Sequence, residues 1–576
     1  MIRAAEGMLE RVRDVARDDD DWSAIDGPHT IVGRASTRSA LAALGLFIAL
    51  AALHTWPLAS GLGTLSRHDN ADAILNEWAV AWVAHQLPRN PSHLFDANIF
   101  YPEPNTLAFS EHLMLQGAMG APLSWAGVPS LVVHNLLILA GFALTGWTMA
   151  LVLRRRTGSW ACGILAGMLL AFNSHSLSRI AHLQAVHVEF LPLAIMALDR
   201  LLTRPSAANA MRLSLAYVLQ SLTSNYFLVF MTFGLAGAGL ARWRDWIGAG
   251  RLKVFGLVCL SGAVALALLT PFLIHYLQAQ QNQGLTRSLE EVAKYSASWR
   301  DYLSATGNVH YRTWSAPFWR GAGAPLFPGV TALLLAGLAC ATGVAWKHRA
   351  ARTWLAVGVV GLVLSFGASL PGYSFLYHAV PVLQGIRASV RFGYLVLAAV
   401  AALAAFGLAL IRAKYQHRPV ASRMLTAAAL ILVTTEALRT PVPYSPPHLT
   451  PAAYSVLTLE PNGVLVELPL YEPAAFQQNA PYMLHSIVHW RPILNGYSGF
   501  LPASYITHYE RLRGFPDEAT LAYLREIGVT HVAVHANAFI EKSGQARLDA
   551  ISSTPGLRAA ITSPNLTIYT VRSVVP

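Results

Sequence analysis

Residues Arg67–Leu115 read RHDNADAILNEWAVAWVAHQLPRNPSHLFDANIFYPEPNTLAFSEHLML. They follow the first long apolar run of the chain and precede the second. Carboxylates are dense here, although only 12% of all residues are charged. Ionisable side chains that gather at the edge of an apolar domain indicate a functional site. The carboxylates of this stretch include Asp69, Asp72, Glu77 and Glu111.

The composition predicts a polytopic integral membrane protein. The chain has 576 residues, of which 54% are hydrophobic, and its mean hydropathy is +0.41. A soluble protein carries about 25% charged residues, roughly twice the fraction found here. Apolar runs near the ~20 residues that a bilayer requires predict an α-helical bundle of about eleven spans. These runs centre on 39–56, 131–153, 160–173, 187–202, 211–223, 225–241, 254–276, 328–346, 353–370, 392–412 and 421–438.

Lys and Arg cluster in every second loop between these runs, as in Arg154–Arg156 after the second run and Arg412–Arg423 after the tenth. This pattern places the N-terminus in the cytoplasm. An odd number of spans then places the C-terminus outside, which fits the inner membrane of a bacterium. The net charge of +12 is therefore explained by topology rather than by nucleic acid.

The same alternation divides the chain into three parts. Residues 1–38 are predicted to form a cytoplasmic polar tail, and 39–439 a transmembrane domain with external loops 57–130 and 277–327. Residues 440–576 are predicted to form a small external α/β domain. Its predicted strands include GVLVELPL and NLTIYTVRSV, and TLAYLREIGVTHVAVH reads as a helix, a glycine turn and a strand.

The first external loop contains two predicted helices. Apolar residues, including Trp78 and Trp82, fall on one stripe of 71–82, which favours a helix lying in the membrane interface. A second short helix is expected after Ser110, because serine is a favourable N-cap.

Several segments together resemble the GT-C membrane glycosyltransferases, and more closely the bacterial YfhO-like group. The resemblance covers nearly all of 40–576. It implies an enzyme that transfers a sugar from a polyprenyl-phosphate-linked donor to an envelope glycan, lipid or polymer on the external face. The chain lacks the WWDYG motif of oligosaccharyltransferases, so transfer to asparagine is not expected. The segments are HDNADAILNEWAVAW, LFDANIFYPEPNTLAFSEH, RIAHLQAVHVEFLPLA, LQGIRASVRFGYLVLA, RPILNGYSGFLP and LREIGVTHVAVH.

Asp69 matches the loop acid of that family by position. An inverting transfer needs one carboxylate to deprotonate the acceptor hydroxyl while the lipid phosphate leaves. We therefore predict that Asp69 is the general base and that Asp72 contributes to substrate binding. The alternative is structural: Asp69 caps a helix that begins at Ala71, and Asp72 lies in its favourable first turn.

Other ionisable residues lie near the predicted external ends of the spans. Glu111 and His112 are candidates for binding sugar hydroxyls or for a second acid, and His182, His187 and Glu189 are candidates for substrate binding. The alternatives are a helix-dipole carboxylate, a solvated histidine and interfacial hydrogen bonds. The spacing HxxxxHxE is not a tight metal motif, so we predict no metal site and no cofactor, with a divalent cation left open.

Arg387 and Arg391 precede the tenth span on its predicted external side, against the positive-inside trend. Their spacing of four predicts a shared helix face, on which two guanidiniums would bind a lipid phosphate. The alternative is snorkelling toward anionic headgroups. For the chain as a whole, the competing functions are a flippase or transporter of lipid-linked saccharide, and a non-catalytic envelope assembly factor.

Overall fold

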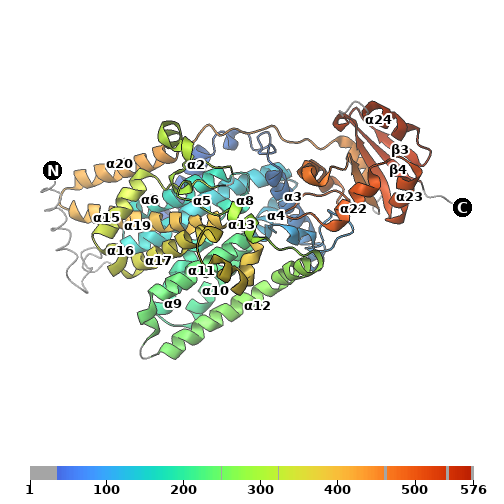
Figure 1. Ribbon diagram of the computed structural model, residues 1–576. Coiled ribbons are helices and arrows are strands. Elements are labelled where there is room, and N and C mark those ends of the chain that lie inside the picture. The colour runs from blue at the N-terminus through green and yellow to red at the C-terminus, as the bar shows by residue number, and fades with distance from the viewer. Residues whose placement is uncertain (1–35, 248–249, 322, 460–462, 540–543, 573–576) are drawn as a thin grey trace. The chain divides into compact units, whose positions relative to one another are not determined.

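The computed structural model of the chain describes residues 36–247, 250–321, 323–459, 463–539 and 544–572 (Figure 1). The predicted polar tail 1–38 lies outside these residues, except for its last three. The described chain is mostly helical, with one small sheet near the C-terminus. It forms two compact units. The first contains 36–61, 136–270 and 286–443, and the second contains 62–135, 271–285 and 444–572.

Helices lie at every predicted apolar run, which confirms the α-helical fold class. The run 328–346 is divided, because Gly343 adopts a φ of +84° between two helices. The helices are α2 Thr37–His54, α5 Ser130–Thr157, α6 Trp160–Ala171, α9 Phe190–Thr203, α10 Ala207–Thr223, α11 Asn225–Ala241, α12 Arg251–Gln283, α15 Val330–Ala341, α16 Val344–Lys347, α17 Arg349–Ser365, α19 Gly393–Lys414 and α20 Pro419–Ala437.

Six segments among the described residues are long and apolar enough to cross a membrane, so the chain is an integral membrane protein. The apolar helices α11 and α15 are shorter. The six segments are Thr37–His54, Ser130–Thr157, Trp160–Ser178, Arg251–Gln283, Ser389–Lys414 and Pro419–Ala437.

Helix α19 forms the centre of the first unit. It is apolar on all sides, as expected of a helix surrounded by others, and most of its residues are buried. Small residues allow its neighbours to approach closely. A Cβ atom at Gly407 would overlap the backbone carbonyl of Leu335 in α15, and one at Gly361 of α17 would lie 2.6 Å from the Cβ of Leu395.

Some of the arginines from which the membrane topology was predicted also form ion pairs that stabilise the fold. Arg156, at the end of α5, and the buried Arg242 both form ion pairs with Asp199 of α9. Arg242 also pairs with Asp245. A buried carboxylate is stable only when charges of opposite sign contact it, so these pairs fix the three segments to one another.

The second unit is built around α3 Ala71–Gln86 and α4 Met114–Trp125. Most residues of α3 are buried, including Trp78 and Trp82, so its apolar stripe faces protein rather than lipid, and its place in the membrane interface stays a prediction. Its stripe packs against protein instead: Ile74 contacts Leu484 in a small apolar cluster, and the Trp82 indole donates to the carbonyl of Leu94 at 2.8 Å.

Helix α3 begins at Ala71 with Asp72 in its first turn, as predicted, but its cap and the start of α4 differ from the prediction. Asn70, not Asp69, is the N-cap of α3, and its side chain accepts a hydrogen bond from the Asp72 N–H at 2.9 Å. The structural alternative for Asp69 is therefore wrong. Helix α4 starts at Met114 after Leu113, which has a φ of +48°, rather than after Ser110.

The C-terminal region forms a four-stranded sheet in the order β1-β2-β4-β3. β1 Val464–Leu468 pairs in parallel with β2 Val529–His535, which pairs antiparallel with β4 Leu566–Val571. These three strands lie where the sequence predicted them. The edge strand β3 Leu557–Thr562 was not predicted, because its side chains are mostly exposed and lack an alternating apolar pattern.

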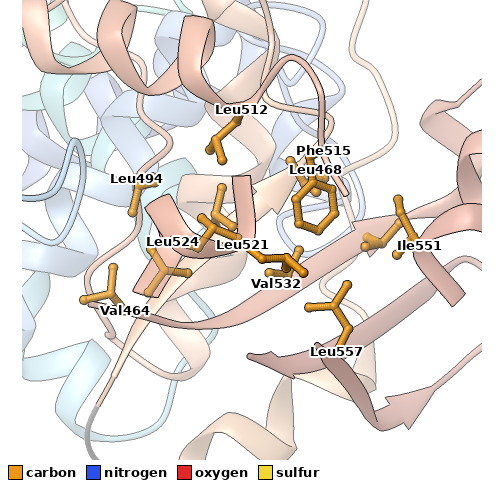
Figure 2. Close-up of a cluster of buried hydrophobic side chains, with 13 residues drawn as sticks. Val464, Leu468, Leu494, Leu512, Phe515, Leu521, Leu524, Val532, Ile551 and Leu557 are labelled. Carbon is orange, nitrogen blue, oxygen red and sulfur yellow. The ribbon is translucent and has the colours of Figure 1, made fainter. Parts of the chain in front are cut away.

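Figure 2 shows the apolar core that holds this sheet. Leu521 and Leu524, from the predicted helix α23 Glu518–Glu526, pack with Val532 of the central strand. The remaining helices of the chain are short. They are α7 Ser174–Ser178, α8 Leu183–Val186, α13 Leu289–Lys294, α14 Asn308–His310, α18 Tyr373–Ala379, α21 Ala480–His485, α22 Ala503–Leu512 and α24 Gly544–Ser553.

Candidate functional site

The segment that carries Asp69 is held by residues 445–448 of the same unit. Ser66 and Ser445 exchange two backbone hydrogen bonds of 2.9 Å. The Asp69 N–H donates to the Ser445 hydroxyl at 3.2 Å, and the His448 N–H donates to His68 Nδ1 at 2.9 Å. The backbone around Asp69 is therefore fixed on one side by a distant part of the chain.

Arg67 donates two hydrogen bonds to the Asp69 carboxylate, one to each oxygen. Nε of Arg67 lies 2.9 Å from Oδ1, and Nη2 lies 3.1 Å from Oδ2. This hydrogen bonding lowers the pKa of Asp69 below its usual range. The side chain is nevertheless 49% exposed. Asp69 is thus ionised, oriented and accessible, as a general base must be.

Glu77 has a different environment from Asp69. It is buried, its Oε2 lies 2.8 Å from His68 Nε2, and its Oε1 accepts from the Ser130 hydroxyl at 2.6 Å. Because Nδ1 of His68 accepts from a backbone N–H, Nε2 carries the hydrogen and donates. Burial, the largest single effect, would raise the pKa of Glu77, but the hydrogen bonds from His68 and Ser130 and the electrostatic effects of His134 and His68 together outweigh it, and the pKa is lowered. Glu77 therefore anchors the loop as a buried carboxylate.

Asp72, Glu111 and His112 lie in the same unit as Asp69. The Tyr497 hydroxyl donates to Asp72 Oδ1 at 2.8 Å, and Glu111 is half-buried. His112 is buried among Phe95, Phe272 and Tyr276. Its Nδ1 accepts from the Met114 N–H at 3.0 Å, and burial lowers its pKa to about 3. His112 is therefore a neutral structural residue at the start of α4, neither solvated nor exposed to a sugar.

His187 and Glu189 belong to the first unit and form a buried pair. Nδ1 of His187 lies 2.9 Å from Glu189 Oε1, and Nε2 lies 3.0 Å from the carbonyl of Leu137. The two side chains are 0% and 4% exposed. Gly141 faces the ring directly, because a Cβ there would lie 2.9 Å from His187 Cδ2. The structure thus places these two candidates inside the protein core, with no exposed surface for a sugar.

Arg387 and Arg391 do not share a helix face. Arg391 lies in the 3-10 turn Ser389–Phe392, and Arg387 precedes it in a segment without regular secondary structure. The predicted helix fails here because α19 begins only at Gly393. The two guanidiniums stack on aromatic rings instead: Arg391 lies 4.7 Å from the ring centre of Tyr226, and Arg387 lies 5.4 Å from that of Tyr295.

A third arginine, Arg287, shares the carboxylate of Glu291 with Arg387. Arg287 donates to Glu291 Oε1 at 3.2 Å, and Arg387 Nη1 lies 3.7 Å from the same oxygen. Burial lowers the pKa of Arg287, and the charge of Arg387 acts in the same direction. Arg287 was not predicted as a site residue, although it lies in a predicted external loop and, like Arg387, carries a positive charge there against the positive-inside trend.

We call Arg287, Arg387 and Arg391, with Glu291, the arginine cluster. Three guanidiniums against one carboxylate leave a net charge of +2 (3 − 1). Within the part of the chain that the structure describes, the buried Arg391 Nε has no hydrogen-bond partner. His182, which belongs to the same unit, lies half-buried at the start of α8. The cluster can bind an anion.

The predicted site residues thus fall into two groups, Asp69 and Asp72 in one unit and His182, Arg387 and Arg391 in the other. Within the described ranges, no three His, Cys, Asp or Glu side chains are grouped to hold a metal ion. Three residues that contact or extend these groups were not predicted from the sequence: Arg67, Tyr497 and Arg287. Tyr497 lies in RPILNGYSGFLP, a segment that carried the family resemblance.

The fold has counterparts among solved structures. An archaeal oligosaccharyltransferase, AglB from Archaeoglobus fulgidus in complex with an inhibitory peptide and a dolichol-phosphate, matches with a TM-score of 0.50 and 13% identity, over 87% of this chain and 69% of that one. ArnT from Cupriavidus metallidurans, bound to undecaprenyl phosphate, matches with a TM-score of 0.49 and 12% identity, over 93% and 98%. No protein-family model and no curated protein sequence matches the chain. The likeness to AglB shows the fold alone, which is the GT-C fold of membrane glycosyltransferases.

Proposed function

We propose that this chain is a GT-C-type glycosyltransferase of the bacterial inner membrane. It transfers a sugar from a polyprenyl-phosphate-linked donor to a glycan, lipid or polymer acceptor on the external face. The observation that carries the proposal is the arginine cluster, whose excess positive charge and unpartnered buried Nε suit a phosphate. The GT-C fold supports the same reaction class by analogy, and the kinship to the YfhO-like group stays a prediction.

In this mechanism the phosphate of the donor binds at the arginine cluster. Asp69 removes the proton from the acceptor hydroxyl, and the acceptor oxygen attacks the anomeric carbon with inversion. The bond between that carbon and the lipid phosphate breaks, and the phosphate leaves with the electron pair. The guanidiniums stabilise the charge that develops on the phosphate. Each of these steps uses protein side chains alone, without a cofactor.

The role of the arginine cluster is tested by Arg391→Gln. We expect the donor KM to rise and kcat/KM for the donor to fall about 10- to 100-fold, the cost of losing one charge-assisted hydrogen bond. The acceptor KM should change much less. Steady-state kinetics with a polyprenyl-phosphate-sugar, at saturating acceptor, measure both constants.

Arg300→Gln is the matched control, because Arg300 is an exposed arginine of the predicted external loop 277–327, which also carries Arg287, and it stacks on Trp299. It should retain the parental donor KM. An Arg391→Gln protein that folds and keeps the parental donor KM would show that the phosphate binds elsewhere.

A further inference from the structure

The first unit contains a pocket that the proposed mechanism does not use. It lies at the C-terminal ends of α6 and α20, and His310 and residues 327–329 complete its lining. It opens to solvent, and its cavity volume is about 20 Å³, enough for one group the size of a hydroxyl. One side is apolar, with Phe172, Phe327 and Val433, and the other is polar, with Asn173, His310 and Glu436.

Glu436 is held firmly in this pocket. Its Oε1 accepts from the Thr331 N–H at 3.1 Å and from the Thr331 hydroxyl at 2.7 Å. Its Oε2 faces Gly329, where a Cβ would overlap it, and the φ of +99° at that position favours glycine. A carboxylate is unfavourable in the last turn of a helix, where the dipole is negative. The surrounding residues are therefore arranged to keep this charge in place.

His310 presents a donor to the same space. Its Nδ1 accepts from the Trp314 indole at 3.2 Å, so the hydrogen of the neutral ring is on Nε2. Nε2 is buried and lies 3.5 Å from Glu436 Oε2, which is too long for a good hydrogen bond. Among the described residues this nitrogen has no hydrogen-bond partner. A donor and a charged acceptor thus lie side by side at the pocket, separated by a small gap.

We propose that this pocket binds a hydroxyl group of an amphipathic molecule. A hydroxyl is the small group that both accepts a hydrogen bond, here from Nε2 of His310, and donates one, here to Glu436 Oε2. The apolar wall fits a carbon face next to that hydroxyl. Two sources offer this chemistry, the ring of a sugar and the glycerol headgroup of a lipid. A metal ion does not fit, because Glu436 and His310 have no third ligand of the required type among the described residues.

Hydrogen exchange on the full chain in nanodiscs separates the two sources. One arm adds a monosaccharide such as glucose or mannose to phosphatidylcholine discs, and the other replaces part of that lipid by phosphatidylglycerol. We expect one arm to slow exchange in the peptide covering 305–331, which contains the Thr331 N–H. No donor is added, so the readout is independent of any transfer activity.

Two substitutions test the polar groups. Glu436→Gln keeps the size of the side chain but removes its charge, and His310→Phe keeps a ring against Trp314 and Phe327 but removes the donor. Each should raise the ligand concentration for half-maximal protection about tenfold or more. Thr435→Val is the control, because the Thr435 hydroxyl is exposed and bonds within its own helix. The proposal is overturned if neither arm slows exchange in the parent chain, or if both variants retain parental binding.

Discussion

At the scale of single residues, the proposed base can be tested without disturbing its helix. Because Asn70 caps α3, both Asp69→Asn and Asp69→Ala should leave that helix intact. Neither variant can accept the proton of the acceptor hydroxyl, so we expect the transfer rate to fall about 10²–10⁴-fold. Single-turnover transfer to acceptor, with thermal unfolding as the check on folding, measures this.

The pH dependence gives an independent control for the same prediction. Arg67 lowers the pKa of Asp69, so the carboxylate stays deprotonated, and active as a base, to low pH. Removing the guanidinium in Arg67→Gln raises that pKa, and the acidic limb of kcat/KM should move to higher pH. Arg89→Gln, which changes an exposed arginine of the same loop, should not move it. Parental activity of Asp69→Asn would exclude Asp69 as the base.

The sequence shows which residues are charged, but it does not show which groups those charged side chains contact. Asp69 was found from its position after the first span, yet its partner Arg67 was not, because two opposite charges two residues apart on an irregular segment have no periodic signal. Asp72 pairs with Tyr497, 425 positions away. Contacts of that separation depend on tertiary packing, which no local pattern contains.

At the scale of elements, the approach of α15 to α19 depends on one glycine. The backbone of Leu335 lies where a Cβ of residue 407 would be, and backbone cannot move aside as a flexible side chain can. We expect Gly407→Ala to destabilise the chain by about 1–3 kcal/mol through overpacking. The midpoint of thermal unfolding in detergent should fall accordingly.

Gly337→Ala, on α15 itself, is the matched control. Its Cβ would have no heavy atom within 4 Å, so the helix should gain up to about 1 kcal/mol from the better helix former. If the two substitutions lower the midpoint equally, close packing at residue 407 is not what the glycine provides.

Most helices and strands could be predicted from the sequence, but the residues that surround each of them in the fold could not. Apolar length identified the membrane helices, and alternation identified β1, β2 and β4. The stripe on α3 also predicted a helix, but its burial comes from partners far along the chain, such as Leu484. Arg387 and Arg391 show the opposite error: their spacing fits a helix, but the backbone is not helical until Gly393.

At the scale of the whole molecule, the basic loops have two roles that the sequence does not separate. Arg156 and Arg242 neutralise Asp199, so part of the positive charge on which the topology rests is used for folding. Other arginines and lysines, such as Arg418 and Arg423, lie around the start of α20 and are mainly exposed. The positive-inside pattern therefore remains, and the orientation it predicts can be measured.

We predict that the C-terminus lies outside the cytoplasm. Lys414 ends α19 and Arg418 directly precedes α20, so the turn between the two helices is cytoplasmic by the positive-inside rule, and one further crossing by α20 carries the chain outward. Alkaline phosphatase, which is active only outside the cytoplasm, should be active when fused after residue 576. The same reporter inserted after residue 416 should be inactive. The reverse pair of results would place the C-terminal sheet and residues 62–135 on the cytoplasmic side, where an externally acting Asp69 is impossible.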